Sequence, residues 1–325
     1  MPEHRVGSPI HQLDREAPVY IAGHRGLVGS ALWRHLEANG FTNLVGWSSS
    51  ELDLRDRAAV HERVRALRPA VVIDAAARVG GILANHTYPA EFLSENLQIQ
   101  VNLMDAAVAA EVPRLLFLGS SCIYPKFAEQ PIREDSLLTG ALEPTNDAYA
   151  IAKIAGIMQV QAIRRQYGLP YISAMPTNLY GPGDNFHPRN SHVLPALIRR
   201  FHEAKESGAA SVTCWGTGTP KREFLHVDDL AAACLHLLEH YDDPQTINIG
   251  TGVDQTIAEI AEMTAAAVDY QGDIEWDTSK PDGTPRKLLD VSRIKATGWK
   301  PQIDLQTGLS DTYRWFLQHA SEVRG

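Results

Sequence analysis

The chain has 325 residues, of which 44% are hydrophobic and 21% are charged, the proportions of an ordinary soluble globular protein. Its net charge of −9 argues against non-specific binding to nucleic acids or anionic membranes, so an anionic substrate would need a local cluster of Arg and Lys. No run is long enough to span a membrane, residues 1–17 lack the apolar core of a signal peptide, and three scattered cysteines form neither a zinc site nor a disulfide framework. We expect a cytoplasmic protein that holds no metal.

An alternation of strands and helices begins at residue 19. The short apolar run 19–22 is followed by a glycine-rich stretch, 23–29, and then by a predicted helix from Ser30 to Leu36. A glycine-rich turn between a strand and a helix lets the backbone approach a pyrophosphate and directs the helix N-terminus at it. The stretch therefore predicts a dinucleotide-binding turn.

The end of the second predicted strand, 44–47, bears on which dinucleotide is bound. A site that prefers NAD usually has an Asp or Glu at this point for the ribose hydroxyls. This chain has Ser48-Ser49-Ser50 instead, and Arg25 in the glycine-rich stretch is a candidate partner for a 2′-phosphate. The combination favours NADP over NAD, the alternative being that Arg25 is a solvated loop residue.

Two further strands end in segments that could line a site. Strand 71–74 is followed by three alanines, 75–77, which leave room for a flat cofactor, and a long amphipathic helix is predicted at roughly 89–110. Strand 115–118 runs into Ser120 to Tyr124. Because ligands gather at the carboxyl ends of strands in an open α/β sheet, we expect this last segment to line the site. A simple serine turn is the alternative.

The next helix carries a candidate proton donor. It is predicted to begin after Pro144, with Thr145 or Asn146 as the N-cap. Tyr149 and Lys153 are four residues apart and therefore share one face. An ammonium beside a phenol lowers the pKa of the tyrosine, which can then exchange a proton with a carbonyl or an alcohol. Taken alone, the pair is also a common arrangement of surface neighbours.

After strand 171–175 the alternation changes. We predict a helix from about residue 193, a turn-rich hairpin at 215–224, an alanine-rich helix from 226 that returns to the main sheet, a late strand at 246–250 and a basic loop at 279–287. Cations on separate elements could converge on a diphosphate, with an aromatic ring stacking on a base or sugar, or they could be scattered solvated cations. These candidates are Arg200, Arg222, Arg286, Lys287 and Trp215.

The predicted fold class is α/β, a Rossmann-type doubly wound parallel sheet with a smaller α/β C-terminal substrate domain. Residues 1–17 are expected to form a flexible tail, with closure over the site or a partner as an alternative. The NADP-binding domain would span 18–183, and segments at about 224–250 would return to it. The substrate domain would comprise 184–223 and 251–325.

The glycine-rich stretch, Ser120, Tyr149 and Lys153, in this order, resemble the pattern of extended short-chain dehydrogenase/reductases. Longer motifs within 18–318 are similar to one family of that group, the GDP-L-fucose synthases, which are GDP-4-keto-6-deoxy-D-mannose 3,5-epimerase-4-reductases. These motifs occupy 23–30, 77–82, 119–126, 143–153, 175–182, 222–229 and 279–287. The resemblance implies conversion of GDP-4-dehydro-6-deoxy-D-mannose to GDP-L-fucose with NADPH.

The resemblance also implies roles for single residues. Cys122 and His192 would be the acid/base pair of the epimerisation; Tyr149 would protonate the oxygen at C4, assisted by Lys153, while Ser120 orients the carbonyl. The implied NADP contacts are Gly23, His24, Arg25, Gly26, Leu27, Val28, Gly29, Ser48, Asp53, Ala75, Ala76, Ala77, Lys153, Pro176, Asn178, Leu179 and His192. The implied contacts to the GDP-sugar are Arg200, Trp215, Arg222, Asp282 and Lys287.

The sequence leaves open the cofactor preference, the oligomeric state and two alternative functions. Members of the family often carry an arginine after the second strand, which this chain lacks, so its NADP preference could be weaker than usual. The resemblance implies a homodimer in which helices near 89–110 and 147–167 form a four-helix bundle. A sibling enzyme for another GDP-4-keto sugar, such as a dideoxy sugar or a heptose, fits the same motifs. A catalytically silent dinucleotide-binding sensor is the third hypothesis.

Overall fold

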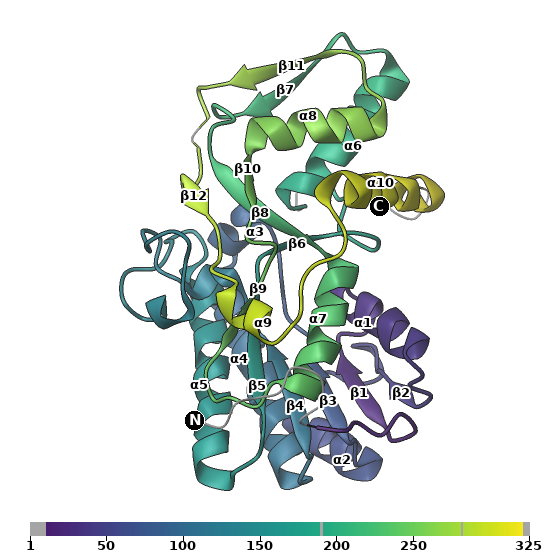
Figure 1. Ribbon diagram of the computed structural model, residues 1–325, viewed down its shortest axis with the longest axis vertical. Coiled ribbons are helices and arrows are strands. Elements are labelled where there is room, and N and C mark those ends of the chain that lie inside the picture. Colours follow the sequence, from purple (N-terminus) through teal and green to yellow (C-terminus); the bar gives the residue numbers. More distant parts are fainter. Residues whose placement is uncertain (1–10, 189–190, 281, 321–325) are drawn as a thin grey trace.

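A computed structural model describes residues 11–188, 191–280 and 282–320 (Figure 1). Its centre is a six-stranded parallel sheet in the order β2-β1-β3-β4-β5-β9. The chain moves outward from β1 to β2 and then crosses to β3 on the other side of β1, so the order reverses beside β1. The strands are β1 (Val19–Ala22), β2 (Leu44–Val45), β3 (Val71–Asp74), β4 (Arg114–Leu118), β5 (Ile172–Pro176) and β9 (Ile247–Ile249).

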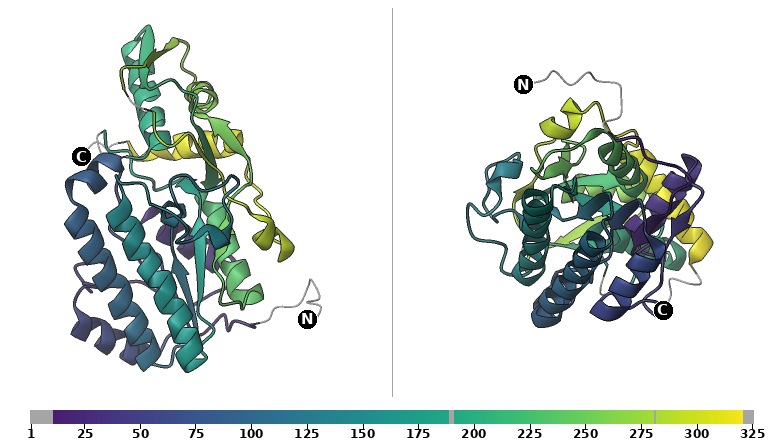
Figure 2. Two further views of the ribbon diagram at one scale, coloured as in Figure 1. Left: turned by 90° about the vertical axis from the view of Figure 1, so that its left-hand side faces the viewer. Right: turned by 90° about the horizontal axis from the view of Figure 1, so that it is seen from below.

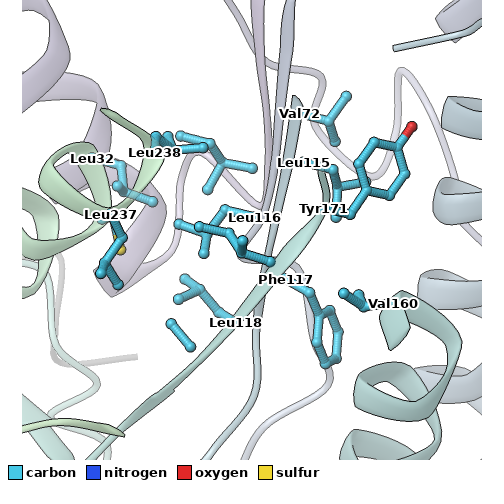
Figure 3. Packing of buried hydrophobic residues seen from close by; sticks show 14 of the residues in the cluster. Leu32, Val72, Leu115, Leu116, Phe117, Leu118, Val160, Tyr171, Leu237 and Leu238 are labelled. Atoms are coloured by element: carbon cyan, nitrogen blue, oxygen red, sulfur yellow. The ribbon is translucent and has the colours of Figure 1, made fainter. Parts of the chain in front are cut away.

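Helices cover both faces of this sheet, which explains why its strands are continuous apolar runs. Residues of β4 alternate between the faces: Leu116 and Leu118 point toward Leu32 and Leu237, whereas Phe117 points toward Val160 (Figure 3). The helices of one face are α1 (Leu27–Ala38) and α7 (Val227–His240), and those of the other are α2 (Arg57–Leu67), α4 (Pro89–Ala109) and α5 (Asp147–Tyr167). The long helices α4 and α5 lie side by side (Figure 2).

A second hydrophobic core lies at the carboxyl ends of the strands and belongs to a part that we call the cap module. Short strands and helices from the second half of the chain build it, around buried aromatic residues such as Phe186 and Phe201. Its elements are β6 (Asn178–Tyr180), α6 (Val193–Ser207), β7 (Ser211–Trp215), β8 (Lys221–His226), β10 (Asp254–Thr256), α8 (Ile257–Val268), β11 (Asp273–Asp277), β12 (Arg286–Lys287) and α10 (Leu305–His319).

Short helical segments complete the chain between these elements. They are α3 (Ile82–Thr87), η1 (Ser121–Ile123), η2 (Glu134–Ser136) and α9 (Ser292–Ala296). In the described ranges, no helix is both long enough and apolar enough to cross a bilayer.

The predicted hairpin at 215–224 is wrong. Strand β7 pairs in parallel with β11, whereas β8 pairs with β6, β10 and β12, so the two strands belong to different sheets. Gly216 and Gly218 adopt φ angles of 82° and 76° in the connection, which a side chain would disfavour. A turn-rich sequence gives the position of the chain reversal and leaves the strand partners undetermined.

The described part of the predicted tail is held against α7. The His11 amide donates to the carbonyl oxygen of Glu239 at 3.0 Å, and Arg15 forms an ion pair with the Glu239 carboxylate at 2.6 Å. The Arg15 guanidinium also lies over the ring of Phe41. Residues 11–17 are therefore anchored to α7, contrary to the expectation of flexibility, and residues 1–10 lie outside the described residues.

Candidate active site

The glycine-rich turn has the shape of a backbone cradle at the reversal of strand order. Gly23 has a φ of +78°, and a Cβ at this position would lie 2.8 Å from the Ala75 carbonyl oxygen. A Cβ on Gly29 would overlap the Gly23 carbonyl oxygen. Helix α1 begins at Leu27, three residues earlier than predicted, with Gly26 as N-cap. The helix N-terminus thus opens directly from the turn, an arrangement that suits a pyrophosphate.

The loop that follows β2 contains a carboxylate that sequence reasoning missed. Glu51 accepts hydrogen bonds from the Ser48 amide at 2.8 Å and the Ser48 hydroxyl at 2.5 Å, and these bonds lower its pKa. The positive charge of Arg25, which is exposed, acts in the same direction. An acidic residue three positions after the strand-end serine was the available signal. Ser48 therefore has a charged acceptor at the place where a 2′-phosphate was expected.

Other predicted cofactor contacts lie in the loops that follow β1, β2 and β3. His24 packs against Gly46 and Trp33, and burial lowers its pKa. Asp53 is exposed to solvent in part and is paired with Arg55 at 2.8 Å. The half-buried alanines 75–77 follow β3 directly and Ala75 and Ala76 adjoin Gly23.

The remaining cofactor candidates lie where the sheet meets the cap module. Pro176 is buried at the end of β5. Asn178 and Leu179 belong to β6, which pairs with β8, and the Asn178 amide donates to the Glu223 carbonyl at 2.8 Å. These residues lie at the carboxyl end of the sheet, on the same side as the glycine-rich turn.

Four predicted catalytic residues come together at the carboxyl end of β4. The Ser120 hydroxyl accepts a hydrogen bond from the Cys122 amide at 3.3 Å. Lys153 reaches in from α5, where its ammonium donates to the Leu118 carbonyl at 2.9 Å and lies 5.9 Å from the centre of the Tyr149 ring. Helix α5 begins at Asp147 with Asn146 as N-cap, in agreement with the sequence, although the Asn146 side chain makes no capping bond. The helix thereby brings Tyr149 and Lys153 close to Ser120 and Cys122 at the end of β4.

Burial dominates the proton affinity of Tyr149. The pKa of its phenol is raised, first by burial and then by the Cys122 and Asp74 groups when these are charged. This direction is opposite to the lowering that the sequence predicts from the lysine alone. The pKa of Lys153 is lowered by burial, and Asp74 opposes that effect. The raised pKa keeps the Tyr149 phenol protonated, which is the state from which a proton can be given to a carbonyl.

Cys122 and Lys287 influence one another although their elements are far apart in the chain. Burial raises the pKa of the Cys122 thiol, and the largest opposing influence is the Lys287 ammonium. Burial lowers the pKa of Lys287, and Cys122 opposes that change. Lys287, which the sequence predicts to bind a diphosphate, is therefore also close enough to Cys122 to lower the pKa of its thiol.

The other candidate substrate residues come from helix α6 and from strands β7, β8 and β12 of the cap module. Arg222 on β8 is the register partner of Lys287 on β12. Arg200 donates to the Thr213 carbonyl at 3.2 Å, two residues before Trp215, whose side chain is 68% exposed.

Asp282 and Arg286 are the remaining candidates in the cap module, and each is already bonded to another residue of the protein. Asp282 accepts bonds from the Thr217 amide at 2.9 Å and hydroxyl at 2.7 Å and so holds the loop after Trp215. Arg286, by contrast, is paired with Asp254 at 2.5 Å and does not join the group.

His192 occupies a different position. It is the N-cap residue of α6, its side chain retains exposed surface, and the surrounding protein lowers its pKa by desolvation. Within the described residues, no hydrogen bond or ion pair joins it to Cys122 or Tyr149. Residues 189–190, which precede it, lie outside the described ranges.

Known proteins share this arrangement. A family model described as "NAD dependent epimerase/dehydratase family" matches residues 19–250. A probable GDP-L-fucose synthase of Oryza sativa subsp. japonica is 59% identical over 96% of this chain and 95% of that one. The GDP-L-fucose synthase of Escherichia coli (strain K12) is 55% identical over 94% of this chain and 98% of its own.

The chain belongs to the GDP-L-fucose synthase family, within the NAD dependent epimerase/dehydratases. A solved structure of a GDP-L-fucose synthetase from Naegleria fowleri bound to NADP has the same fold, with a TM-score of 0.91, 27% identity and 99% of each chain covered. The family assignment and the α/β Rossmann-type fold class, both predicted from sequence, are confirmed.

Proposed function

We propose that the chain is a bifunctional 3,5-epimerase and NADPH-dependent 4-reductase that converts GDP-4-dehydro-6-deoxy-D-mannose to GDP-L-fucose. The observation that carries the proposal is the convergence of Ser120, Cys122, Tyr149 and Lys153 at one strand end, beside the glycine-rich turn. Identity of 55–59% to GDP-L-fucose synthases over nearly the whole chain supports the same activity.

The residues around the glycine-rich turn fit a dinucleotide. Gly23 and Gly29 leave no room for a Cβ, so backbone atoms line the surface where the pyrophosphate would lie. Arg25 and Ser48 would bind the 2′-phosphate, and Lys153 would hold the nicotinamide ribose. NADPH supplies a hydride when bound; the chain's own residues position the reacting groups and hold the proton.

Epimerisation uses the acidity that the C4 ketone confers on the hydrogens at C3 and C5. Cys122 and His192 would act as a pair: one removes a proton to form an enolate, and the other returns a proton to the opposite face of the same carbon. The Lys287 ammonium would favour the thiolate of Cys122, whose pKa burial otherwise raises. Repeating the exchange at the second carbon inverts both centres.

Reduction follows at the same place. Ser120 would hold the C4 carbonyl by a hydrogen bond, and Tyr149 would donate its proton to the oxygen as the carbon is reduced. The buried environment that raises the pKa of Tyr149 keeps that proton available.

The cap module would act as the substrate domain and the six-stranded sheet with its helices as the NADP-binding domain. Arg200, Arg222 and Lys287 would bind the diphosphate and Trp215 would stack on the base or sugar. Asp282 would contribute by holding the loop that follows Trp215.

A homodimer through α4 and α5 is part of the proposal. The two helices cover the same face side by side (Figure 2). On α5, Ile151 is 45% exposed and Met158 is 41% exposed, one heptad apart. Such a pair of apolar positions suits helix packing against a second copy. Light scattering of the wild type and of Met158→Glu tests it, a dimer that becomes monomeric being expected. A cytoplasmic location stays a prediction of the sequence.

The experiment that tests the activity is incubation with NADPH and GDP-4-dehydro-6-deoxy-D-mannose in deuterated water. Loss of nicotinamide absorbance and NMR detection of GDP-L-fucose with deuterium at C3 and C5 are expected. Cys122→Ser and His192→Ala should lose the exchange. NADPH binding without turnover would reject the substrate, and a panel of GDP-4-keto dideoxy sugars and heptoses would then test the sibling activity.

A further inference from the structure

Asp74 is a buried carboxylate beneath the candidate active site that takes no part in the catalytic scheme above. It is the last residue of β3, and its side chain is 0% exposed. Oδ1 accepts a hydrogen bond from the Ala76 amide at 3.2 Å. Oδ2 is buried and, among the residues that the structure describes, has no hydrogen-bond partner. A buried charge is costly unless another charge compensates it.

The register of the sheet shows which face Asp74 occupies. Asp74 is paired with Phe117 on β4, and directly paired residues of parallel strands point to the same face. Phe117 points toward Val160 of α5, on the opposite side from Leu116 (Figure 3). The Lys153 ammonium lies 4.8 Å from the centre of the Phe117 ring. Asp74 therefore faces the part of α5 that carries Lys153.

The charged and titratable groups that face Asp74 come from two elements, α5 and β1. Lys153 on α5 is the opposite charge, and it lowers the pKa of Asp74, which burial raises to about 6. Tyr149 on α5 and Tyr20 on β1 are phenols, and Asp74 raises the pKa of each. Arg78, in the loop that follows β3, is instead paired with Glu95 of α4 at 2.5 Å.

We propose that Asp74 is a positioning residue for the reductase step, whose carboxylate balances the charge of Lys153 and keeps the proton on Tyr149. The inference rests on the proposed function and adds a third member to the tyrosine–lysine pair. Asp74 acts through Lys153 and Tyr149 and has no contact with the reacting carbon in this scheme. In its ionised state it also disfavours a phenolate on Tyr149, so the proton donor stays loaded in alkaline solution.

The consequence for pH dependence follows from counting charges. With Asp74 ionised, loss of a proton from the Tyr149–Lys153 pair leaves the buried group negative overall. Asp74→Asn removes one negative charge without changing the shape, so the pair loses its first proton more readily. The alkaline decline in kcat for reduction should move to lower pH by about one to two units, the size typical of one near charge. The step near pH 6 that comes from Asp74 itself should disappear.

The test measures kcat and KM for NADPH oxidation with the keto sugar between pH 5 and 10. The wild type is compared with Asp74→Asn, with Asp74→Leu in case the amide variant does not fold, and with Asp311→Asn as a matched control. Asp311 forms an exposed ion pair with Arg314 on α10. We expect the alkaline limb to move in both Asp74 variants with KM for NADPH within about twofold, and the control to follow the wild type. Profiles that superimpose would overturn the inference.

A second readout separates this inference from the proposed function. Tyrosine labelled with carbon-13 at Cζ reports the ionisation of Tyr149 by NMR in the NADP-bound protein, without any sugar. If the wild type does not reduce the keto sugar but the Tyr149 signal titrates at lower pH in Asp74→Asn, the substrate assignment fails and Asp74 keeps its role. An unchanged Tyr149 titration rejects that role whatever the activity.

Discussion

The glycine-rich turn and the candidate substrate residues of the cap module present different surfaces to a ligand. In the turn, the surface is backbone, and Gly23 and Gly29 fit only because they have no side chain. In the cap module, long side chains such as Arg200 and Arg222 extend from separate elements. The first region should be destroyed by adding an atom, whereas the second should respond to the charge and shape of the groups that its side chains present.

The largest effect should come from a residue that belongs to neither region. Tyr149→Phe removes the proton donor, so kcat for NADPH oxidation should fall about 10²- to 10⁴-fold. Deuterium exchange at C3 and C5 should persist, because Cys122 and His192 are unchanged, and NADPH and GDP-sugar affinities should stay within about twofold. Parallel loss of exchange and reduction would show that Tyr149 also serves the epimerisation.

Gly29→Ala tests the backbone region. The added methyl group would overlap the Gly23 carbonyl oxygen, and overpacking of this kind costs about 1–3 kcal/mol. If that cost falls on the turn in its binding shape, the Kd for NADPH rises about 5- to 150-fold, as fluorescence titration would measure.

Gly40→Ala is the matched control for that change. Gly40 also has a positive φ, +84°, but nothing lies within 4 Å of an added Cβ. The control should lower Tm through backbone strain while the Kd for NADPH stays constant. Equal losses of NADPH affinity in the two variants would contradict the claim that lack of space at Gly29 shapes the binding surface.

Arg222→Lys tests the side-chain region. The substitution keeps the charge and loses the planar fork that matches a phosphate, so KM for the GDP-sugar should rise about tenfold. The Kd for NADPH should not change, since Arg222 lies on β8 in the cap module. Arg314→Lys, in an exposed ion pair on α10, is the control and should leave both constants unchanged. A selective rise in the Kd for NADPH would contradict the division between the regions.

The smallest effect concerns Glu51, the carboxylate beside Ser48. Glu51→Gln removes a negative charge near the expected 2′-phosphate, so the ratio of kcat/KM for NADPH over NADH should rise about two- to fivefold, the scale of an exposed charge pair. Because the charge is exposed, the difference should shrink at 1 M salt. An equal rise for both cofactors would show that Glu51 acts on the turn as a whole.

How much the sequence alone predicts depends on whether a feature is specified locally or by distant segments. The six strands of the main sheet and the glycine-rich turn are predicted because local patterns specify them: apolar runs bounded by small residues. Pairing between distant segments leaves no such pattern, which is why the sequence predicts a hairpin at 215–224 although β7 and β8 belong to different sheets. The direction of the Tyr149 pKa shift depends first on burial and then on the nearby Cys122 and Asp74, and all three are properties of the packed structure.

The candidate site residues also divide into those that local motifs predict and those that only the packed structure reveals. Ser120, Tyr149 and Lys153 have fixed spacing within known motifs, and the structure brings them together. Glu51 and Asp74 were missed because their significance lies in what surrounds them. An acidic residue that ends an otherwise apolar strand is a usable signal, since burial of an unpaired carboxylate needs a reason.

The position of β9 has a consequence for synthesis on the ribosome. This strand pairs with β5, yet β6, β7 and β8 are made between the two. Until Ile247–Ile249 leaves the exit tunnel, one edge of the nascent sheet has unpaired backbone groups, the kind of edge that recruits strands from other chains. Slow translation through the cap module would lengthen this exposure. Chaperone demand should therefore peak before Ile247–Ile249 has left the exit tunnel.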